Sequence, residues 1–243
     1  MTTIGHDVLI ELARYDTPTI CNAIELFAIR PQTAGYTDAR IRACFPELPP
    51  MVGFAATATF RGSEGSRGGD GYATLEAQIE RFAELSGPPV VVFQDLDDPP
   101  VAATFGEVMC RIYQAYGARG LITSGAGRDL EQVRALAFPV FTGGSICSHG
   151  YYRIPDIHVP VRVGGLLIHP DDLLHADLNG ITCIPSEIAA EVADVAKEFV
   201  ASEATLLGIL KGAPPGVREL AQARAEHQAR LEQLRRRVAR RRD

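Results

Sequence analysis

An arginine and an aspartate stand side by side, as Arg128-Asp129, in the segment TSGAGRDLEQV between an apolar run and a helical pattern. Ligands in open α/β sheets collect where strands end, because helix N-termini and loop amides converge there. A permanently charged guanidinium beside a carboxylate could bind an anionic substrate and stabilise negative charge that develops on it. The helix dipole alone also explains an aspartate in a first helical turn. The pair therefore indicates anion chemistry only when other residues point to the same place.

Two glycine-rich segments could bind phosphate, but neither has a complete motif. Gly125-Ala126-Gly127 lacks the third glycine of a dinucleotide loop, because Leu130 stands in its place, and no acidic residue follows at the distance expected for ribose binding. The segment GSEGSRGGDG at 62–71 has no Gly-Lys-Ser/Thr sequence and so is not a Walker A loop. We expect it to be a mobile loop over the edge of a site.

The histidines and cysteines form no metal-binding pattern. The six histidines are scattered and no HExxH sequence occurs, which argues against a histidine zinc site. His149, in the predicted loop SICSHG, could transfer protons, although the pattern favours a surface histidine there. The five cysteines are odd in number and include no CxxC pair. This argues against a disulfide framework or a thiolate zinc site, and favours a reducing cytoplasm.

Helical and strand patterns alternate around these residues. This alternation predicts an α/β domain with several parallel strands joined by right-handed crossovers. Residues 154–185 are rich in Val, Ile, Pro and Gly and predict a mostly antiparallel β segment. We expect one domain at 1–216 and a separate helical tail at 217–243. The predicted helices are 17–27, 72–85, 102–117, 128–137, 186–212 and 217–243, and the predicted strands are 53–62, 88–96, 119–125 and 138–144.

Composition and charge exclude several classes of protein. Of 243 residues, 46% are hydrophobic and 22% charged, which is typical of a soluble globular protein. No apolar run approaches the roughly 18 residues of a membrane span, and the N-terminal residues lack the pattern of a secretory signal. From Arg218 onward nine arginines oppose four acidic residues, a charge of +5, so the total of −6 leaves −11 on residues 1–217. We do not expect so acidic a body to bind nucleic acid.

The tail at 217–243 has the pattern of a basic amphipathic helix. We expect it to pack on an acidic neighbouring subunit or to remain solvated, with binding to RNA or a membrane surface as the alternative. Its apolar side is formed by Leu220, His227, Leu231, Leu234 and Val238.

An ordered set of motifs resembles a known family. The resemblance covers about residues 16–200, and the tail lies outside it. It is carried by the series Gly106-Glu107, Gly117, Gly120-Leu121-Ile122, Gly125 and Arg128-Asp129, together with the segments DTPTICNAIE, FPVF, VPVRVGG and HADLNG. The set is similar to the signature of the 4-hydroxy-4-methyl-2-oxoglutarate aldolases. That family also contains the regulator of ribonuclease E activity A and proteins long labelled menaquinone methyltransferase-like.

The resemblance implies a layered α/β/β sandwich of the swivelling β/β/α type, assembled as a trimer or hexamer with sites near subunit interfaces. It implies a metal-dependent pyruvate aldolase that also decarboxylates oxaloacetate, with a small 2-oxo acid as substrate. From the lack of an apolar span we expect no membrane partner. Asp129 would hold Mg²⁺ or Mn²⁺, largely through waters, and Arg128 would bind the 2-oxo oxygen. Ser124 and Arg128 form the implied catalytic set. The implied substrate-binding set is Gly106, Glu107, Val108, Met109 and Arg128, through backbone amides for the first residues of the helix.

Two positions depart from the aldolase pattern. Ser124 stands where the aldolases often carry Asp, and Gln132 stands where they carry an acidic residue. Ser124 could hydrogen-bond a water, but it is not a base. These departures bear on which substrate is cleaved more than on the class of reaction that the resemblance implies.

Two other functions fit the same resemblance. The relatives that bind and inhibit ribonuclease E lack the aspartate after the arginine, so the presence of Asp129 favours an enzyme over a binding protein. A lyase or dehydratase acting on a sugar acid would use the same pair of residues to stabilise an enolate.

Overall fold

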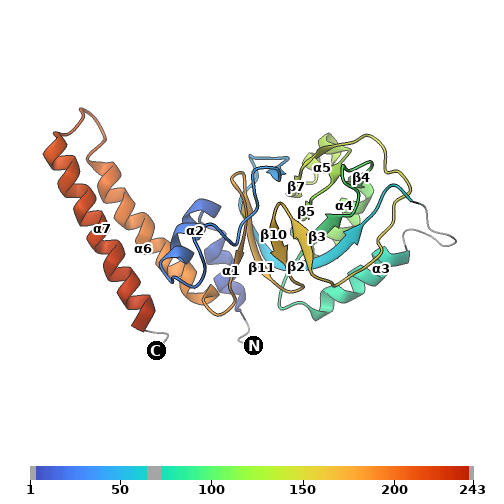
Figure 1. Cartoon of the computed structure of the whole chain (residues 1–243), viewed down its shortest axis with the longest axis horizontal. Coiled ribbons are helices and arrows are strands. Elements are labelled where there is room, and N and C mark those ends of the chain that lie inside the picture. The colour runs from blue at the N-terminus through green and yellow to red at the C-terminus, as the bar shows by residue number, and fades with distance from the viewer. Residues whose placement is uncertain (1–3, 65–72, 241–243) are drawn as a thin grey trace.

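A computed structural model describes residues 4–64 and 73–240 and shows a mixed α/β fold built on a seven-stranded sheet (Figure 1). The strand order is β1-β7-β5-β3-β2-β11-β12. Strands β2, β3, β5 and β7 are parallel, whereas β1, β11 and β12 run antiparallel to their neighbours. The predicted order of parallel strands followed by an antiparallel segment is confirmed. The strands are β1 (Arg42–Ala43), β2 (Met51–Phe60), β3 (Pro89–Asp95), β5 (Leu121–Thr123), β7 (Val140–Thr142), β11 (Leu173–Asp177) and β12 (Gly180–Ile184).

Two small sheets accompany the large one. The first contains three short parallel strands, β4 (Ala103–Phe105), β6 (Ala126–Gly127) and β8 (Gly144–Ser145), in the order β4-β6-β8. The second is an antiparallel hairpin of β9 (Val161–Val163) and β10 (Leu166–Ile168).

The predicted helix at 102–117 is wrong over its first residues. Residues 103–105 form β4, and helix α4 (Glu107–Ala115) begins only after Gly106. The backbone of Gly106 is extended, and the amide of Ala103 donates to the carbonyl of Ser148. Pairing with segments distant in sequence therefore determines the secondary structure of residues 103–106.

The remaining helices lie where the apolar periodicity predicts them, except for a helix at His6–Leu12, which was not predicted. Helix α2 begins because the Asp16 carboxylate accepts the amide of Thr19 and Pro18 fits the first turn. These helices are α1 (His6–Leu12), α2 (Thr17–Glu25), α3 (Ala73–Glu80) with the 3₁₀ turn η1 (Arg81–Glu84), α5 (Leu130–Ala135), α6 (Ala189–Gly208) and α7 (Val217–Arg240).

The large sheet is covered on both faces, which explains why β3 reads as a continuous apolar run. Val91 and Phe93 belong to the core that includes Met109 and Tyr113 of α4. Val90 and Val92 belong to a second core, which includes residues of the β9–β10 hairpin. The residues of β2 are buried along its whole length.

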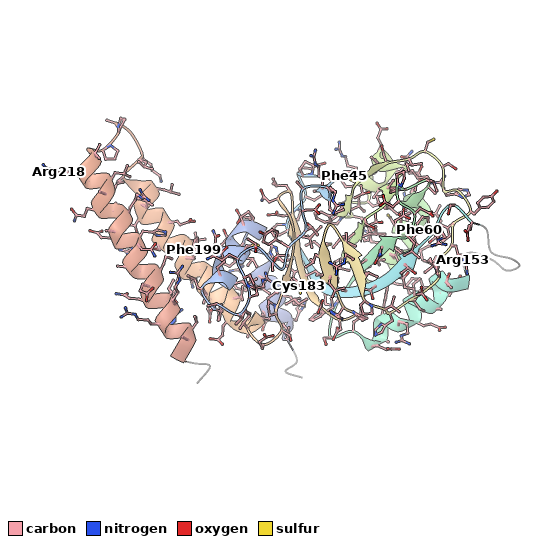
Figure 2. All side chains as sticks on the ribbon, viewed as in Figure 1. Phe45, Phe60, Arg153, Cys183, Phe199 and Arg218 are labelled. Carbon is pink, nitrogen blue, oxygen red and sulfur yellow. The ribbon has the colours of Figure 1, made fainter. Side chains whose placement is uncertain are left out.

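Helices α6 and α7 form a hairpin that projects from one side of the body (Figure 1). Leu231, Leu234 and Val238 of α7 belong to the same core cluster as Phe199 of α6. Figure 2 shows Arg218 at the far end of this hairpin, away from Phe45 and Phe60 in the body. No helix in the described part of the chain is both long enough and apolar enough to span a bilayer.

Candidate functional site

The site forms where two neighbouring parallel strands end and two helices begin. Strand β4 leads through Gly106 into α4, and β6 leads through Arg128 and Asp129 into α5. Because β4 and β6 are paired in parallel, their carboxyl ends meet at one edge of the small sheet. The amide of Arg128 donates to the carbonyl of Phe105 over 3.0 Å, which fixes the two ends together.

Asp129 lies against the N-terminus of α4. Its Oδ2 atom accepts the amide of Glu107 over 3.1 Å and lies 3.8 Å from Nε of Arg128. The positive end of the helix dipole stabilises a carboxylate there. The other oxygen, Oδ1, accepts no hydrogen bond from the residues that the structure describes. Asp129 therefore has one oxygen tied to the protein and one available to a ligand.

The backbone at this corner is unusual in two places. Asp129 has φ +54°, in the left-handed region that few residues other than glycine adopt without strain. A Cβ on Gly106 would lie 2.6 Å from Oδ2 of Asp129 and 3.1 Å from Nε of Arg128. A glycine at 106 therefore permits the close approach of the Arg128-Asp129 pair to the start of α4.

A small pocket of about 40 Å³ opens at this corner. It brings together five of the residues implicated by the sequence, and adds four that were not assigned a role there: Ala103, Thr104, Phe105 and Tyr152. His149, for which the sequence favours a surface position, is exposed and is among the residues that line the pocket. The lining residues are Ala103, Thr104, Phe105, Gly106, Val108, Met109, Arg128, Asp129, His149 and Tyr152.

Glu107, Ser124 and Gln132 do not line this pocket. Glu107 contributes its amide to Asp129, while its side chain pairs with Arg111 over 2.8 Å. The hydroxyl oxygen of Ser124 accepts the amide of Asp95 over 2.8 Å, at the end of β5 in the large sheet. Gln132 is exposed on α5. The predicted loop at 62–71 is described only up to residue 64, and its remainder lies outside the described residues.

Asp95, at the carboxyl end of β3, is a half-buried acid that was not identified from the sequence. Its Oδ2 atom is buried and has no hydrogen-bond partner among the described residues. Burial raises the pKa of Asp95 to about 6. A Cβ on Gly125 would collide with both this oxygen and the hydroxyl of Thr104, so the carboxyl lies directly behind the loop that carries Arg128. Its position at the end of the largely apolar strand β3 does not by itself indicate this burial.

The pKa of Asp95 predicts a pH dependence of stability. The folded state binds this proton more tightly than the unfolded chain, whose carboxyl has a pKa near 3.8. The free energy of unfolding should therefore fall as pH rises from about 4 to about 6. If the carboxyl were fully enclosed, the free energy of unfolding would fall by about 3 kcal/mol. Because Asp95 is half-buried and solvent screens its charge, we expect a fall of about 1 kcal/mol.

Asp95→Asn should remove this part of the pH dependence. Urea unfolding of both proteins at pH 4.5 and pH 7.5 measures it. The free energy of unfolding of the variant, taken relative to that of the wild type, should be about 1 kcal/mol higher at pH 7.5 than at pH 4.5. An identical pH dependence in the two proteins would contradict the raised pKa.

A metal ion would have few protein ligands in this pocket. Among the described residues, no group of three or more His, Cys, Asp or Glu side chains is placed to hold one. Mg²⁺ commonly binds through one or two carboxylates and keeps several waters, with substrate oxygens completing its shell. Asp129, with Oδ1 available and a partly exposed side chain, fits this mode of binding.

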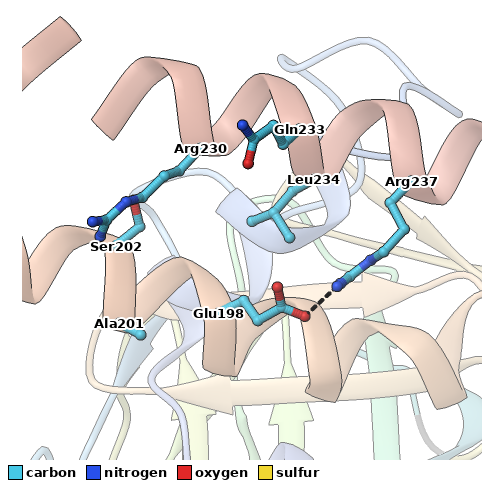
Figure 3. Close-up of a pocket in the computed structure, with 7 residues that line it drawn as sticks. All are labelled: Glu198, Ala201, Ser202, Arg230, Gln233, Leu234 and Arg237. Atoms are coloured by element: carbon cyan, nitrogen blue, oxygen red, sulfur yellow. Dashed lines mark ion pairs between the residues drawn. The ribbon is translucent and has the colours of Figure 1, made fainter. Parts of the chain in front are cut away.

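A larger cavity, of about 420 Å³, lies between α6 and α7 (Figure 3). Its polar groups largely bind one another: Arg237 pairs with Glu198 over 2.5 Å, and Ser202 hydrogen-bonds Nδ1 of His227 over 2.8 Å. Arg230 donates to the hydroxyl of Thr205 over 2.9 Å. We therefore interpret this cavity as a groove between packed helices, and the smaller pocket as the candidate active site.

Comparison with known proteins gives matches over more than half of this chain. A family model described as "RraA-like: Aldolase/RraA" matches residues 17–183. A protein of Halalkalibacterium halodurans named "Putative 4-hydroxy-4-methyl-2-oxoglutarate aldolase" is 32% identical over 136 residues. The match covers 56% of this chain and 62%, less than two thirds, of that protein.

Two solved structures show the same fold. An uncharacterized protein from Pseudomonas syringae pv. tomato superposes with a TM-score of 0.72 at 22% identity, covering 92% of this chain and 95% of the other. Streptomyces coelicolor RraAS2, described as an unusual member of the RNase ES inhibitor RraA protein family, superposes with a TM-score of 0.66 at 23% identity, covering 84% of this chain and 96% of the other. At these identities the similarity concerns the fold alone.

Proposed function

Because the chain belongs to the RraA-like (Aldolase/RraA) family, we propose that it is a divalent-metal-dependent lyase that cleaves a 4-hydroxy-2-oxo acid to pyruvate. Decarboxylation of oxaloacetate is the proposed side activity. One observation carries the proposal: Arg128 and Asp129 share a pocket with the N-terminus of α4. The aldolase name of the Halalkalibacterium halodurans relative supports it.

The pocket residues match the needs of this chemistry. Cleaving the C3–C4 bond of a 4-hydroxy-2-oxo acid and losing CO₂ from oxaloacetate both leave the enolate of pyruvate. Arg128 would stabilise negative charge on the 2-oxo oxygen, because its guanidinium stays protonated throughout. Asp129 would hold Mg²⁺ or Mn²⁺, which when bound supplies a Lewis acid for the 2-oxo group.

The start of α4 would bind the substrate carboxylate. Of the three amides implicated there, that of Glu107 already donates to Asp129. The amides of Val108 and Met109 are the ones we assign to the carboxylate, since the first amides of a helix have no intrahelical acceptor. Val108 is two-thirds exposed, which leaves this end of the helix open to a ligand.

The direct test is release of pyruvate from oxaloacetate and from 4-hydroxy-4-methyl-2-oxoglutarate, with Mg²⁺ and with a chelator. We expect turnover of both that is lost on chelation. Turnover untouched by chelation would rule out the metal-dependent mechanism. A protein inert towards a panel of 4-hydroxy-2-oxo acids, sugar acids and oxaloacetate would favour the binding function instead.

We also propose that the α/β/β layering of the family and a trimeric or hexameric assembly apply here, with the pocket near a subunit interface. The charges support assembly through the tail: residues from Arg218 onward carry +5 and the rest of the chain −11. Arg218 and Arg224 are exposed on α7 and form no ion pair among the described residues. They would face the acidic body of a neighbouring copy.

Reversing these two charges should weaken the assembly. Arg218→Glu with Arg224→Glu leaves the buried contacts of Leu231, Leu234 and Val238 intact, whereas deletion of 217–243 would expose the apolar face of α6. Light scattering at low salt should give a trimeric or hexameric mass for the wild type and a smaller mass for the double variant. Arg218→Lys with Arg224→Lys is the matched control. Equal masses for all three proteins would contradict a role of α7 in assembly.

A further inference from the structure

We propose that His149 is the general acid and base of the pocket, a role that rests on the proposed lyase function. It would accept the proton of the substrate's C4 hydroxyl and return it to C3 of the enolate. The observation behind this is an imidazole held by a hydrogen bond on an anchored loop that lines the pocket containing Arg128 and Asp129.

The loop that carries His149 is anchored on both sides. Before it, the amide of Ile146 donates to the carbonyl of Gly127 over 3.1 Å, and the carbonyl of Ser148 accepts the amide of Ala103 over 2.7 Å. After it, the amide of Tyr151 donates to the carbonyl of Gly62 over 3.0 Å. Two of these anchors are the strands that end at the site, so His149 is positioned by the same framework as Arg128.

The contacts of the imidazole define its tautomer. Nδ1 lies 2.8 Å from the carbonyl oxygen of Gly150, and since a carbonyl can only accept, Nδ1 carries the proton. In the neutral ring the lone pair is then on Nε2, which has no hydrogen-bond partner among the described residues. Gly150 has φ +53°, and a Cβ there would lie 2.6 Å from the carbonyl oxygen of Gly62. Gly150, whose carbonyl orients the imidazole of His149, is therefore itself held close to the backbone of Gly62.

The other titratable groups of the pocket do not suit this role. Arg128 does not lose its proton, and Asp129 is the proposed metal ligand with one oxygen bound to the amide of Glu107. The hydroxyl of Tyr152 is buried and donates to the sulfur of Met109 over 3.2 Å. A histidine exchanges protons near neutral pH, and general acid–base catalysis is most efficient when the pKa lies near the working pH.

One residue is sufficient for the proton transfers of the retro-aldol reaction, because it returns the proton that it accepts. Nε2 takes the proton of the C4 hydroxyl, and the O–H electron pair becomes the new C4 carbonyl. The C3–C4 bond breaks, and its electron pair forms the enolate of pyruvate. Nε2 then returns the proton to C3, which leaves pyruvate, a carbonyl product and neutral His149. Decarboxylation of oxaloacetate differs because CO₂ departs without a base.

This difference gives the test. His149→Gln keeps a polar, exposed side chain and should lower kcat for retro-aldol cleavage by about 10²–10⁴-fold. It should lower oxaloacetate decarboxylation by less than about 10-fold, since only protonation of the enolate is affected. His169→Gln, at another exposed loop histidine, is the matched control and should change neither rate.

The outcomes separate the two proposals. A wild type inert on both substrates overturns the lyase function and this inference with it. An active wild type with an equally active His149→Gln variant overturns the inference alone, as does an equal loss of both activities. A readout without turnover is the ¹⁵N NMR spectrum of the imidazoles in the metal-free protein, with His149→Gln as the assignment. It should show Nδ1 protonated and Nε2 unprotonated, and the opposite tautomer would overturn the inference.

Discussion

Replacing Arg128 by alanine should lower kcat for pyruvate release by about 10²–10³-fold, or about 3–4 kcal/mol of transition-state stabilisation. The guanidinium lies in the pocket beside Asp129, where it would meet the negative charge that develops on the 2-oxo oxygen. Arg128→Lys should recover only part of the rate, because a lysine keeps the charge but lacks the planar fork of donors. Steady-state kinetics with oxaloacetate as the substrate give kcat for the wild type and for both variants.

The matched control is Arg119→Lys, at an exposed arginine outside the pocket, which should leave kcat unchanged. The loss in Arg128→Ala should fall on kcat and kcat/KM together, because the interaction strengthens in the transition state. A variant with a normal kcat and only a raised KM would assign Arg128 to ground-state binding instead.

Asp129→Asn should raise the concentration of Mg²⁺ needed for activity by at least about 100-fold, or abolish turnover. Asparagine is the informative substitution for two structural reasons. It keeps an oxygen that can accept the amide of Glu107, and it tolerates the left-handed backbone that Asp129 adopts at φ +54°. The change therefore removes the negative charge while the loop is preserved.

Binding of Mn²⁺, followed by the loss of its free-ion electron paramagnetic resonance signal, gives a second measurement that does not depend on turnover. Glu131→Gln, the next acidic residue on α5 and an exposed one, is the control and should bind Mn²⁺ as the wild type does. Unchanged Mn²⁺ affinity and activity in Asp129→Asn would remove Asp129 from the site.

The elements that follow from local pattern could be predicted from the sequence. The apolar run of β3 and the turn-rich segment at 154–185 predicted a buried parallel strand and an antiparallel region, and both are present. Strand β4 could not be predicted, because Ala103–Phe105 continues the apolar pattern of α4 and becomes a strand only by pairing with β6. Its identity depends on a partner more than twenty residues away.

The candidate site divides in the same way. Arg128 and Asp129 were identified because their neighbours resemble a family signature, and the pocket contains both. Asp95 and His149 could not be assigned from local sequence. Asp95 acquires its raised pKa from burial behind Gly125, and His149 reaches the pocket through hydrogen bonds of its loop to β4 and β6. Such long-range contacts leave no local pattern in the sequence.

Strand β6 is only two residues long, yet it sits between β4 and β8 and leads directly into Arg128. Side chains alternate between the faces of a strand, so one residue inserted or deleted between β5 and Arg128 would turn the guanidinium away from the pocket and move the anchor of the His149 loop. Length changes in this interval should therefore be tolerated far less than point substitutions. The spacing of the chain here is as much a requirement for the chemistry as the identity of its residues.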